Sequence, residues 1–473
     1  MKKLALLFTL IIVSSQIISG QFLYSTNADS LMSEEPGLTP DINLVYKYNP
    51  IKPLWIPVLE SFAQNLLMGG FNYVTGSEFA KISTSTIAHN FERGWATDAD
   101  GFPTNMLGHP LQGTMLYNFA RSSGYNYWVS LGVASIGSWH WEYFMENEPP
   151  AWNDQIMTSY GGSLIGEVFY RLSNLIIDES STGAERFWRE VGAGVFNPAR
   201  LINRWMSGRI SRVTNVYLFK KEHFFGEVAF GGNNVAEGTN FEEKGNNSPM
   251  LSLDFVYGRL FKSSKIDPFD FFRFKAALNF KNQPLFGQLS LYNIFAGRVI
   301  KYKNKSTFLY GVFGYFDYLE NNVYQVGATG AGIGVGYRTK PKSSIQFVGT
   351  FSAGAIFMGG ANSDYAVEKN VGFLDSARTY NMGPGALVKA ETILRFSFGS
   401  LYIGYDFWWI HTWDGAPGNE FIGMLAPKFR VRVYENWFVG LEYLFYHRFG
   451  QYDNLENRNY INNEQRLFIG YAF

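Results

Sequence analysis

The 473-residue chain has no cysteine, no excess of charge of either sign and, after its first twenty residues, no long apolar run. Without cysteine it can form no disulfide, no thiolate site and no lipid-modified cysteine. Its 40 lysines and arginines balance 40 aspartates and glutamates, so the formal net charge is zero. A protein that binds nucleic acid needs a basic stripe, and we therefore exclude that class of partner.

The first twenty residues, MKKLALLFTLIIVSSQIISG, predict a secretory signal peptide (residues 1–20). Two lysines precede an apolar stretch, and the small residues Ser19 and Gly20 follow it, which is the layout of a cleaved leader. The apolar stretch is shorter than the roughly 20 residues that a membrane-spanning helix needs. We expect the mature chain to begin near Gln21. Residues 21–52 are polar and interrupted by proline, and we expect them to form a flexible leading segment.

Aromatic residues and glycine are abundant: the chain has 43 Phe, 29 Tyr, 12 Trp and 49 Gly, and aromatics make up 18% of it. Together with low charge and the lack of long apolar runs, this composition is typical of a membrane β-barrel, whose strands alternate apolar and polar residues. The segment DFFRFKAALNFK shows the alternation, with Phe272 and Phe274 on one face and Arg273 and Lys275 on the other. The segments around Phe407 and Phe429 repeat it. We expect the charged faces to line the lumen, with these residues pointing inward: Arg273, Lys275, Glu391, Arg395, Asp406, Lys428 and Arg430.

Roughly twelve strand-length segments fit between residues 221 and 473, and bacterial barrels have an even number of strands. The last segment, EQRLFIGYAF, ends in Phe473 and resembles the C-terminal signal that outer-membrane barrels present to their assembly machinery. That signal usually has glycine five residues before the final aromatic, where this chain has Phe468. The stretch Gly359 to Pro384 is too long for a hairpin turn and predicts a surface loop. Six aromatic residues near strand ends predict girdles at the membrane interfaces: Trp408, Trp409, Trp413, Trp437, Tyr443 and Tyr446.

Between residues 53 and 208 the apolar period changes to that of helices. The run LWIPVLESFAQNLLMGGFNYV predicts a helix that is broken at Gly69 and Gly70. Asn153 is a predicted helix cap, and Thr182 with Glu185 a predicted capping box. The predicted fold class is therefore membrane all-β plus α: an antiparallel transmembrane β-barrel of about 12 strands preceded by an N-terminal helical domain. We expect that domain to lie in the periplasm or to plug the barrel; a soluble β-sandwich is the alternative to the barrel.

The stretch GSWHWEYFMENEPPAWND concentrates tryptophan, histidine and carboxylates just before a glycine-rich apolar run. Its helical spacing directs Glu142 toward the bundle interior. His109 opens the preceding helix, and Asp154 opens the following one, where a carboxylate suits the positive N-terminal end. A histidine flanked by carboxylates is poised near neutral pH, so these three residues are candidate catalytic groups. The residues that we expect to form a binding site are His109, Gln112, Trp139, Glu142, Asp154, Gly162 and Glu167.

A purely structural role for these residues is the favoured alternative. Asp154 would then be a helix-start charge, Glu142 would pair with Arg121 or Arg171, and His109 would be a satisfied, half-buried side chain. The sequence contains no nucleophile elbow, zinc-protease motif or phosphate loop. Its six histidines are scattered and no two share a ligand spacing, so we expect no metal site and no cofactor.

Three stretches between Phe91 and Arg204 carry a family resemblance: HPLQGTMLYNFARSSGYNYW, SWHWEYFMENEPPAWNDQIMTSYGGSLIGEVFYRLS and GAERFWREVGAGVFNPAR. They resemble the helical domain of a bacterial envelope family known as domain of unknown function 3943, with its His-Pro, Trp-Glu-Tyr, Asn-Asp and Gly-Gly elements in order. The resemblance implies a helical domain before an outer-membrane barrel in Gram-negative bacteria of the Bacteroidetes type, and it supplies no reaction. Family members often have Pro-Ser before the Asn-Asp pair, where this chain has Pro150, Ala151 and Trp152, so one candidate cap is missing.

We therefore predict an integral protein of the cell outer membrane and favour a non-enzymatic role. Its helical domain would bind an envelope lipid, a small solute or a partner protein, or plug the barrel. The expected partners are outer-membrane lipid, the barrel assembly machinery through the strand ending at Phe473, and a periplasmic protein or small solute. The alternative is an enzyme that acts on lipid or another envelope component through His109, Glu142 and Asp154. A third hypothesis makes the helical half an inner-membrane bundle.

Overall fold

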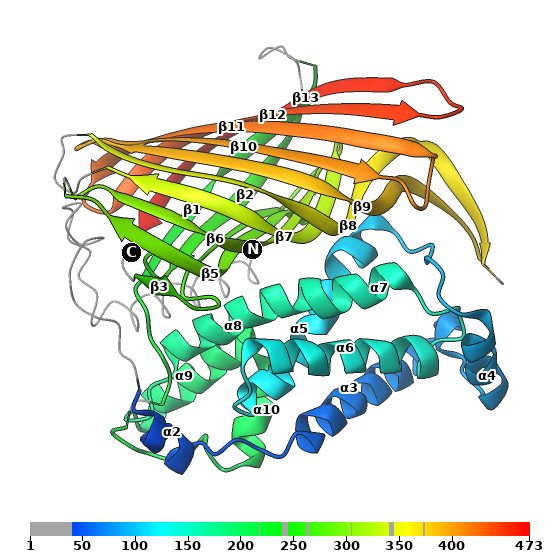
Figure 1. The fold of residues 1–473 in the computed structure, drawn as a ribbon, viewed down its shortest axis with the longest axis horizontal. Coiled ribbons are helices and arrows are strands. Elements are labelled where there is room, and N and C mark those ends of the chain that lie inside the picture. The colour runs from blue at the N-terminus through cyan, green and yellow to red at the C-terminus, as the bar shows by residue number, and fades with distance from the viewer. Residues whose placement is uncertain are drawn as a thin grey trace. The chain divides into compact units, whose positions relative to one another are not determined.

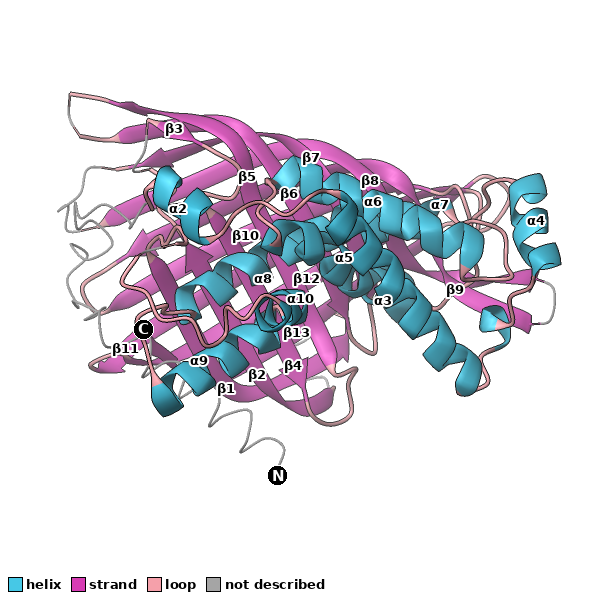
Figure 2. Ribbon diagram, turned by 90° about the horizontal axis from the view of Figure 1, so that it is seen from below, coloured by secondary structure: helices cyan, strands magenta, loops and turns pink. Residues whose placement is uncertain are grey.

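The structure is a computed structural model that describes residues 40–216, 218–238, 245–261, 264–303, 305–339, 345–371 and 374–473; for 366–371 and 374–377 it describes the backbone alone. The predicted signal peptide and residues 21–39 lie outside this range. The chain divides into a helical unit, which extends to Glu222, and a barrel unit that contains His223–Lys369 and Ala377–Phe473 (Figure 1). In Figure 2 the helices of the first unit are cyan and the strands of the second are magenta.

Twelve strands close into a ring in the barrel unit. Each ring strand pairs with the next one along the chain, and β1 pairs antiparallel with β13 to complete the circle. The ring consists of β1 (Phe224–Glu237), β2 (Asn246–Tyr257), β4 (Phe272–Asn279), β5 (Phe286–Lys301), β6 (Thr307–Glu320), β7 (Gln325–Arg338), β8 (Gln346–Val371), β9 (Leu374–Arg395), β10 (Gly399–His411), β11 (Gly418–Tyr434), β12 (Trp437–Tyr452) and β13 (Arg458–Ala472). The short β3 (Lys265–Ile266) pairs with β5 alone. The predicted antiparallel barrel of about twelve strands is thus confirmed.

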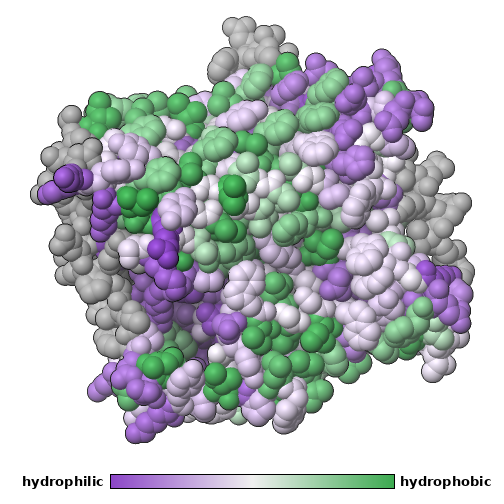
Figure 3. All heavy atoms as spheres, in the orientation of Figure 1, coloured by the Kyte–Doolittle hydropathy of each residue, from purple (hydrophilic) through white to green (hydrophobic). Residues whose placement is uncertain are grey.

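Apolar and polar residues alternate between the two faces of the strands as expected. Along β10, Tyr402 and Trp408 point into the lumen and are buried, whereas Ile403 and Tyr405 on the other face are exposed. On β11, Phe429 is likewise exposed. Figure 3 shows hydrophobic side chains spread over the outer face of the barrel seen in that view, with hydrophilic ones gathered near the strand ends. This outer face suits lipid, and closure of the ring leaves no strand edge unpaired in the membrane.

Phe468 occupies the position where the C-terminal signal usually has glycine, and the neighbouring strands accommodate it. It points inward from β13 and is 4% exposed. Gly231 of β1 and Gly440 of β12 lie directly opposite it in the register. A Cβ atom at either glycine would come within 2.7 Å of Phe468 side-chain atoms. The last strand therefore has Phe468 where the signal usually has glycine, and the two neighbouring strands have glycine opposite it. The Phe468 ring fills the space beside these two glycines.

Two predictions about the barrel were wrong. The stretch Gly359 to Pro384 is not a loop, because β8 continues to Val371 and β9 begins at Leu374. Of the six predicted girdle residues, Trp409, Trp413 and Trp437 are exposed, but Trp408 and Tyr446 do not belong to an outer girdle, because strand alternation directs both into the lumen, where they are 0% and 1% exposed. Position near a strand end does not determine the face of the sheet to which a side chain belongs.

The helical unit contains eleven α-helical or π-helical segments of five or more residues among the described residues, and one short 3-10 turn, η2 (Glu78–Ala80). They are α2 (Ile42–Tyr48), α3 (Trp55–Val74), α4 (Thr84–Arg93), η3 (Thr104–Gly108), α5 (His109–Ser122), α6 (Tyr127–Phe144), α7 (Trp152–Ile156) with η4 (Met157–Gly161), α8 (Gly162–Ile176), α9 (Gly183–Phe196) and α10 (Pro198–Met206). Helix α2 falls within the segment that we expected to be flexible. Helices α5 and α8 form the centre, where Leu116, Ala120, Leu164 and Val168 are fully buried.

Several predicted details of the helices were wrong. Helix α3 continues through Gly69 and Gly70 without a break, and Gly69 lies against the end of the Met145 side chain. Asn153 lies inside α7 instead of capping it. Thr182 precedes α9 but makes no capping hydrogen bond, so the predicted capping box is absent. The sequence pattern located these helices but not their local contacts.

Helices α5 and α8 approach each other closely because both have glycine at the contact. A Cβ atom at Gly113 would lie 1.7 Å from the Thr158 carbonyl oxygen, and one at Gly162 would lie 2.6 Å from the Gly113 backbone. Only glycine allows two backbones to come this near. The contact fixes the first turn of α5, which carries His109, against the segment that follows Asp154.

Candidate functional sites

The lumen of the barrel contains a cavity of about 370 Å³ at the end where β1 begins and β13 ends. Its charged lining residues are Arg259, Arg273, Arg338, Arg395, Arg430 and Arg432, with Glu227, Asp254, Glu391 and Glu435. Among the described lining residues, six positive charges therefore face four negative ones, which favours an anion. Because short turns and both chain ends of bacterial barrels face the periplasm, we expect this cavity to open toward the periplasm.

Four side chains, which we call the lumen bridge, cross the barrel beside this cavity: Arg273, Lys275, Glu391 and Tyr402. Glu391 on β9 accepts hydrogen bonds from Arg273 (3.4 Å) and Lys275 (3.2 Å) on β4, and from the Tyr402 hydroxyl (2.6 Å) on β10. Lys275 also donates to Tyr402 at 2.9 Å. Strands β4 and β10 lie half the ring apart, so the bridge spans the lumen. A second cavity, of about 50 Å³, shares Arg273 and Glu391 with the first, so the bridge lies between the two.

Further side chains fill the lumen on the other side of the bridge. Lys389 on β9 pairs with Asp317 on β6 at 2.7 Å and with Asp406 on β10 at 3.2 Å. The Trp408 indole donates to Asp317 at 3.1 Å. Apolar side chains pack around this group, among them Phe313, Tyr315, Ile422, Met424 and Leu444. All seven residues predicted to point inward line the lumen or form ion pairs across it.

The second candidate site, in the helical unit, is built where two chain segments meet. The Ala96 amide donates to the Pro150 carbonyl at 2.8 Å, and the Trp152 amide donates to the Ala96 carbonyl at 2.9 Å. The rings of Trp95 and Trp152 stack at 4.6 Å. These contacts bring the segment that follows Trp95, which contains Asp98 and Asp100, beside the start of α7. The Ala151 amide donates at 2.8 Å to the Glu142 carboxylate, and α7 itself has no side-chain cap.

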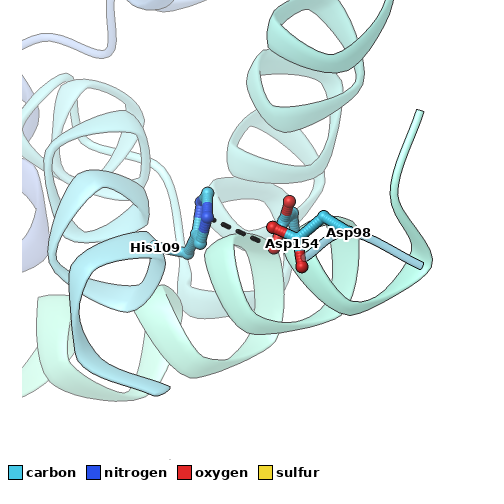
Figure 4. A group of neighbouring side chains, drawn as sticks. All are labelled: Asp98, His109 and Asp154. Carbon is cyan, nitrogen blue, oxygen red and sulfur yellow. Dashed lines mark ion pairs between the residues drawn. The ribbon is translucent and has the colours of Figure 1, made fainter. Parts of the chain in front are cut away.

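His109 and Asp154 converge at this point together with Asp98 (Figure 4). The His109 Nε2 atom lies 3.2 Å from Asp154 Oδ1 and 3.7 Å from Asp100 Oδ2. His109 is 8% exposed and Asp154 is 2% exposed. The π-helical turn η3 ends immediately before His109, and η4 begins three residues after Asp154. Such π-helical turns are often found at functional sites.

Burial and neighbouring carboxylates raise the pKa values of Asp154 and Glu142. Burial, together with Asp98, Glu142, Glu146 and Asp100, raises the pKa of Asp154 well above its usual value. Burial also raises the pKa of Glu142 to about 7, although the Ala151 amide and His109 oppose the shift. For His109, burial lowers the pKa, but the nearby carboxylates outweigh it and the pKa ends above its usual value. The cluster is an acidic environment around one imidazole.

Other residues expected in the binding site lie apart from this cluster or serve packing. Glu167 accepts hydrogen bonds from Tyr117, Arg121 and Arg171 at 2.6 to 2.7 Å, so the arginines predicted to pair with Glu142 pair with Glu167 instead. The Trp139 ring is 39% exposed and packs on Tyr143. Gly162 forms the contact with α5 that is described above. Gln112 is half-buried, and its Nε2 atom has no hydrogen-bond partner among the described residues.

The sequence analysis did not identify Asp98, Asn105 or Asn153 as members of the cluster. The Asp98 Oδ1 atom accepts hydrogen bonds from the amides of Asn105 (2.7 Å) and Asn153 (2.8 Å). The motif Asp98-Ala-Asp100-Gly was the available signal, but it lies outside any predicted helix. Only the pairing of the Ala96 and Ala151 segments brings it to His109.

Comparison with known families confirms the resemblance found in the sequence. Residues 94–199 match the family described as Domain of unknown function (DUF3943). The matched segment contains Asp98, His109, Glu142 and Asp154. No curated protein matches the chain.

Solved structures similar to the chain are outer-membrane proteins. The outer membrane channel DcaP of Acinetobacter baumannii is 10% identical, with a TM-score of 0.25, and the match covers 53% of this chain and 96% of that one. An outer membrane channel from Pseudomonas putida F1 is 10% identical, with a TM-score of 0.26, over 54% and 97% of the two chains. OmpT of Vibrio cholerae is 10% identical, with a TM-score of 0.20, over 53% and 97%. At these values we base the assignment on the strand pairing of the barrel itself.

A closed antiparallel ring with an even number of strands, an apolar outer face and a charged lumen is an outer-membrane barrel. The protein is therefore an integral protein of the cell outer membrane, and the expected localisation is confirmed. In the part of the helical unit that the structure describes, no helix is both long and apolar enough to cross a membrane.

Proposed function

We propose that the barrel is a gated channel for small anionic solutes, which the lumen bridge holds closed. The observation that carries this proposal is the position of the bridge, between a 370 Å³ cavity and the packed remainder of the lumen. A cavity of this volume lies within the usual range for small-molecule sites. Its excess of arginine over acidic residues favours carboxylates or phosphates, which guanidinium groups bind with paired hydrogen bonds.

The bridge is suited to gating because its members come from opposite sides of the ring and one carboxylate joins them. Glu391 is the acceptor for Arg273, Lys275 and Tyr402. Without it, Lys275 would keep only its bond to Tyr402 among the contacts of the described residues, whereas Arg273 would remain paired with Asp254 on β2. Loss of a single side chain should therefore destabilise the closed arrangement.

Planar-bilayer recording of the full-length chain tests the proposal. We expect the wild type to conduct rarely and Glu391→Ala to conduct often. Each loss of about 1.4 kcal/mol in the stability of the closed state raises the ratio of open to closed channels tenfold. A reversal potential in a salt gradient should show preference for the anion.

Glu442→Ala is the matched control. Glu442 also lines the smaller cavity, but it pairs at 3.2 Å with Arg466, its direct neighbour on the adjacent strand, and does not cross the lumen. This variant should conduct like the wild type. Equal currents from wild type and Glu391→Ala, or equal gains from both variants, would contradict a gate at Glu391.

A second candidate function, an enzymatic or binding activity of the helical unit, is favoured by the contact between His109 and Asp154. An enzyme that acts through His109, Glu142 and Asp154 requires these side chains to converge, and the 3.2 Å distance between His109 and Asp154 fits that requirement. Their burial means that a substrate would have to approach from the side of Asp100, whose side chain is 53% exposed. Incubation of the protein with extracted envelope lipids, followed by mass spectrometry, would detect such turnover, and His109→Gln should abolish it.

Lipid contact by the helical unit is supported by an exposed apolar face on α3. The side chains concerned are Trp55, Leu59, Leu66, Leu67, Phe71 and Val74, which are 54% to 83% exposed. An amphipathic helix with such a face can lie in the headgroup region of a membrane.

A further inference from the structure

We propose that Asp98, His109 and Asp154 of the helical unit bind a divalent transition-metal ion. Each of the three residues offers one ligand atom, and these atoms all lie within 4.8 Å of one another. Metal–ligand bonds of about 2.0–2.2 Å place two ligands of one ion about 3–3.5 Å apart. The 3.2 Å separation of His109 Nε2 and Asp154 Oδ1 falls within this range.

The imidazole of His109 supplies an independent indication of a ligand. Its Nε2 atom is buried and lies 3.2 Å from Asp154 Oδ1, yet none of its contacts with described residues has the geometry of a hydrogen bond. A buried polar atom without a partner is costly, and native structures rarely keep one without a reason. A metal ion between the imidazole and the carboxylates would provide the missing partner.

Amide side chains orient the two carboxylates in the way that outer-shell groups orient metal ligands. Asn105 and Asn153 both donate to Asp98 Oδ1, and Asn153 also donates to Asp154 Oδ1 at 2.6 Å. Each carboxylate is thereby held through one oxygen. Both asparagines are fully buried, so the ligand positions are fixed before any ion arrives.

The charge balance also favours a cation. The carboxylates of Asp98, Asp100 and Asp154 all lie close to the single imidazole of His109. A divalent ion would offset this concentration of carboxylates. Asp100 is a candidate fourth ligand and, because it is partly exposed, it marks the route by which an ion would enter.

The donor set selects the class of metal. Imidazole nitrogen combined with carboxylate oxygen suits Zn²⁺, Mn²⁺ and related first-row ions, whereas Ca²⁺ and Mg²⁺ prefer oxygen alone. Zn²⁺ should bind more tightly than Mn²⁺, following the general order of affinities for divalent ions.

Equilibrium dialysis of the full-length protein in detergent, after chelation, tests the site with Zn²⁺, Mn²⁺ and Ca²⁺ as separate probes and elemental analysis as the readout. We expect one Zn²⁺ per chain. His109→Gln should weaken Zn²⁺ binding by about 100-fold or more, since loss of an outer-shell group alone costs about 10- to 100-fold. Co²⁺ bound in place of Zn²⁺ should show a visible absorption band that His109→Gln abolishes.

His89→Gln is the matched control, because His89 is an exposed histidine with the Glu92 carboxylate 3.6 Å away, and its loss should leave Zn²⁺ binding unchanged. Asp154→Asn keeps the shape of the buried side chain and provides a second test if His109→Gln does not fold. Wild-type protein without bound Zn²⁺, full Zn²⁺ binding by either cluster variant, or tighter binding of Ca²⁺ than of Zn²⁺ would overturn the proposal.

Discussion

Two glutamates in the helical unit are buried to the same extent, at 1% exposure, but their surroundings give them opposite protonation behaviour. Glu142 lies among carboxylates, and burial raises its pKa to about 7. Burial would also raise the pKa of Glu167, but Arg121 and Arg171 outweigh it and lower that pKa to about 2. Glu167 on α8 is therefore a charged partner that holds α5 and α8 together through Arg121 and Tyr117 of α5.

Glu167→Gln tests this role. Because the pKa of Glu167 is lower in the folded chain than in the unfolded one, its stabilisation is complete above about pH 4.5 and is lost as the pH falls toward 2, with a total on the order of 3 kcal/mol. The variant should unfold at a lower temperature than the wild type at pH 7, and the difference should shrink at pH 3. Circular dichroism at 222 nm in detergent follows the helices.

Glu185→Gln is the control for that measurement, since Glu185 is exposed and pairs with Arg189 on the surface of α9. Exposed ion pairs contribute little, so its effect should stay below about 1 kcal/mol. A loss of equal size from both substitutions would show that burial of the Glu167 network does not matter.

The direction of Glu142 toward the bundle interior followed from helical spacing, but its partners did not. Spacing determines the face of a helix on which a residue lies, whereas the choice of partner depends on how far each helix is shifted along its neighbour. For this reason the sequence correctly indicated that Arg121 or Arg171 pairs with a buried glutamate. It named Glu142 as that glutamate, whereas the structure shows Glu167. His109 and Asp154 were placed near each other because each begins a helix that flanks α6.

At the scale of elements, the close approach of α5 and α8 determines whether the cluster around His109 can form. The contact depends on Gly113 and Gly162, which face each other where the two backbones meet. Larger residues would separate the helices and move His109 away from the start of α7.

Gly113→Ala should destabilise the helical unit by about 1–3 kcal/mol or more, because its methyl group would overlap the Thr158 carbonyl. Gly132→Ala is the control: it lies in α6 with nothing within 4 Å of the added atom, and it should stabilise the helix by about 0.5–1 kcal/mol. Thermal unfolding at 222 nm distinguishes the two. Opposite signs are required; a gain in stability from both substitutions would mean that glycine acts only through helix propensity.

The strands were easier to predict than the helix contacts, because period-two alternation identifies a strand whatever its partner. Their number and the inward charges, such as Arg273 and Glu391, followed from that pattern. The extension of β8 and β9 beyond Gly359 did not, since the stretch is rich in polar and turn-forming residues, and pairing between the two strands overrides that local preference. Asp98 was missed for a related reason: a backbone bridge outside any helix or ring strand brings it to the site.

At the scale of the whole molecule, the ring closes between β1 and β13, and Phe473 lies at this seam. Its amide donates to the Gly226 carbonyl at 2.8 Å, and the Gly226 amide donates to the Phe473 carbonyl at 2.9 Å. Its ring lies 6.1 Å from that of Phe224. The residue that we expect the assembly machinery to recognise is thus also one that closes the barrel.

Phe473→Ala should lower the amount of protein recovered in the outer-membrane fraction, while the backbone bonds of the seam remain possible. Tyr471→Ala is the control, since Tyr471 lies on the same strand, is exposed and packs on Trp437. Quantitative blotting of fractionated cells measures both variants. Equal recovery of Phe473→Ala and wild type would contradict a role for the terminal aromatic in assembly.

The hairpin of β8 and β9 reaches far beyond what a bilayer requires. At about 3.3 Å per residue, the 26 residues of β8 span roughly 85 Å, against about 40–45 Å for a membrane with its headgroups. Even when strongly tilted, such a ribbon would stand clear of the lipid on the side opposite the chain ends. We expect a large molecule that approaches the membrane from this side to meet the paired strands β8 and β9 before it reaches the rim of the barrel.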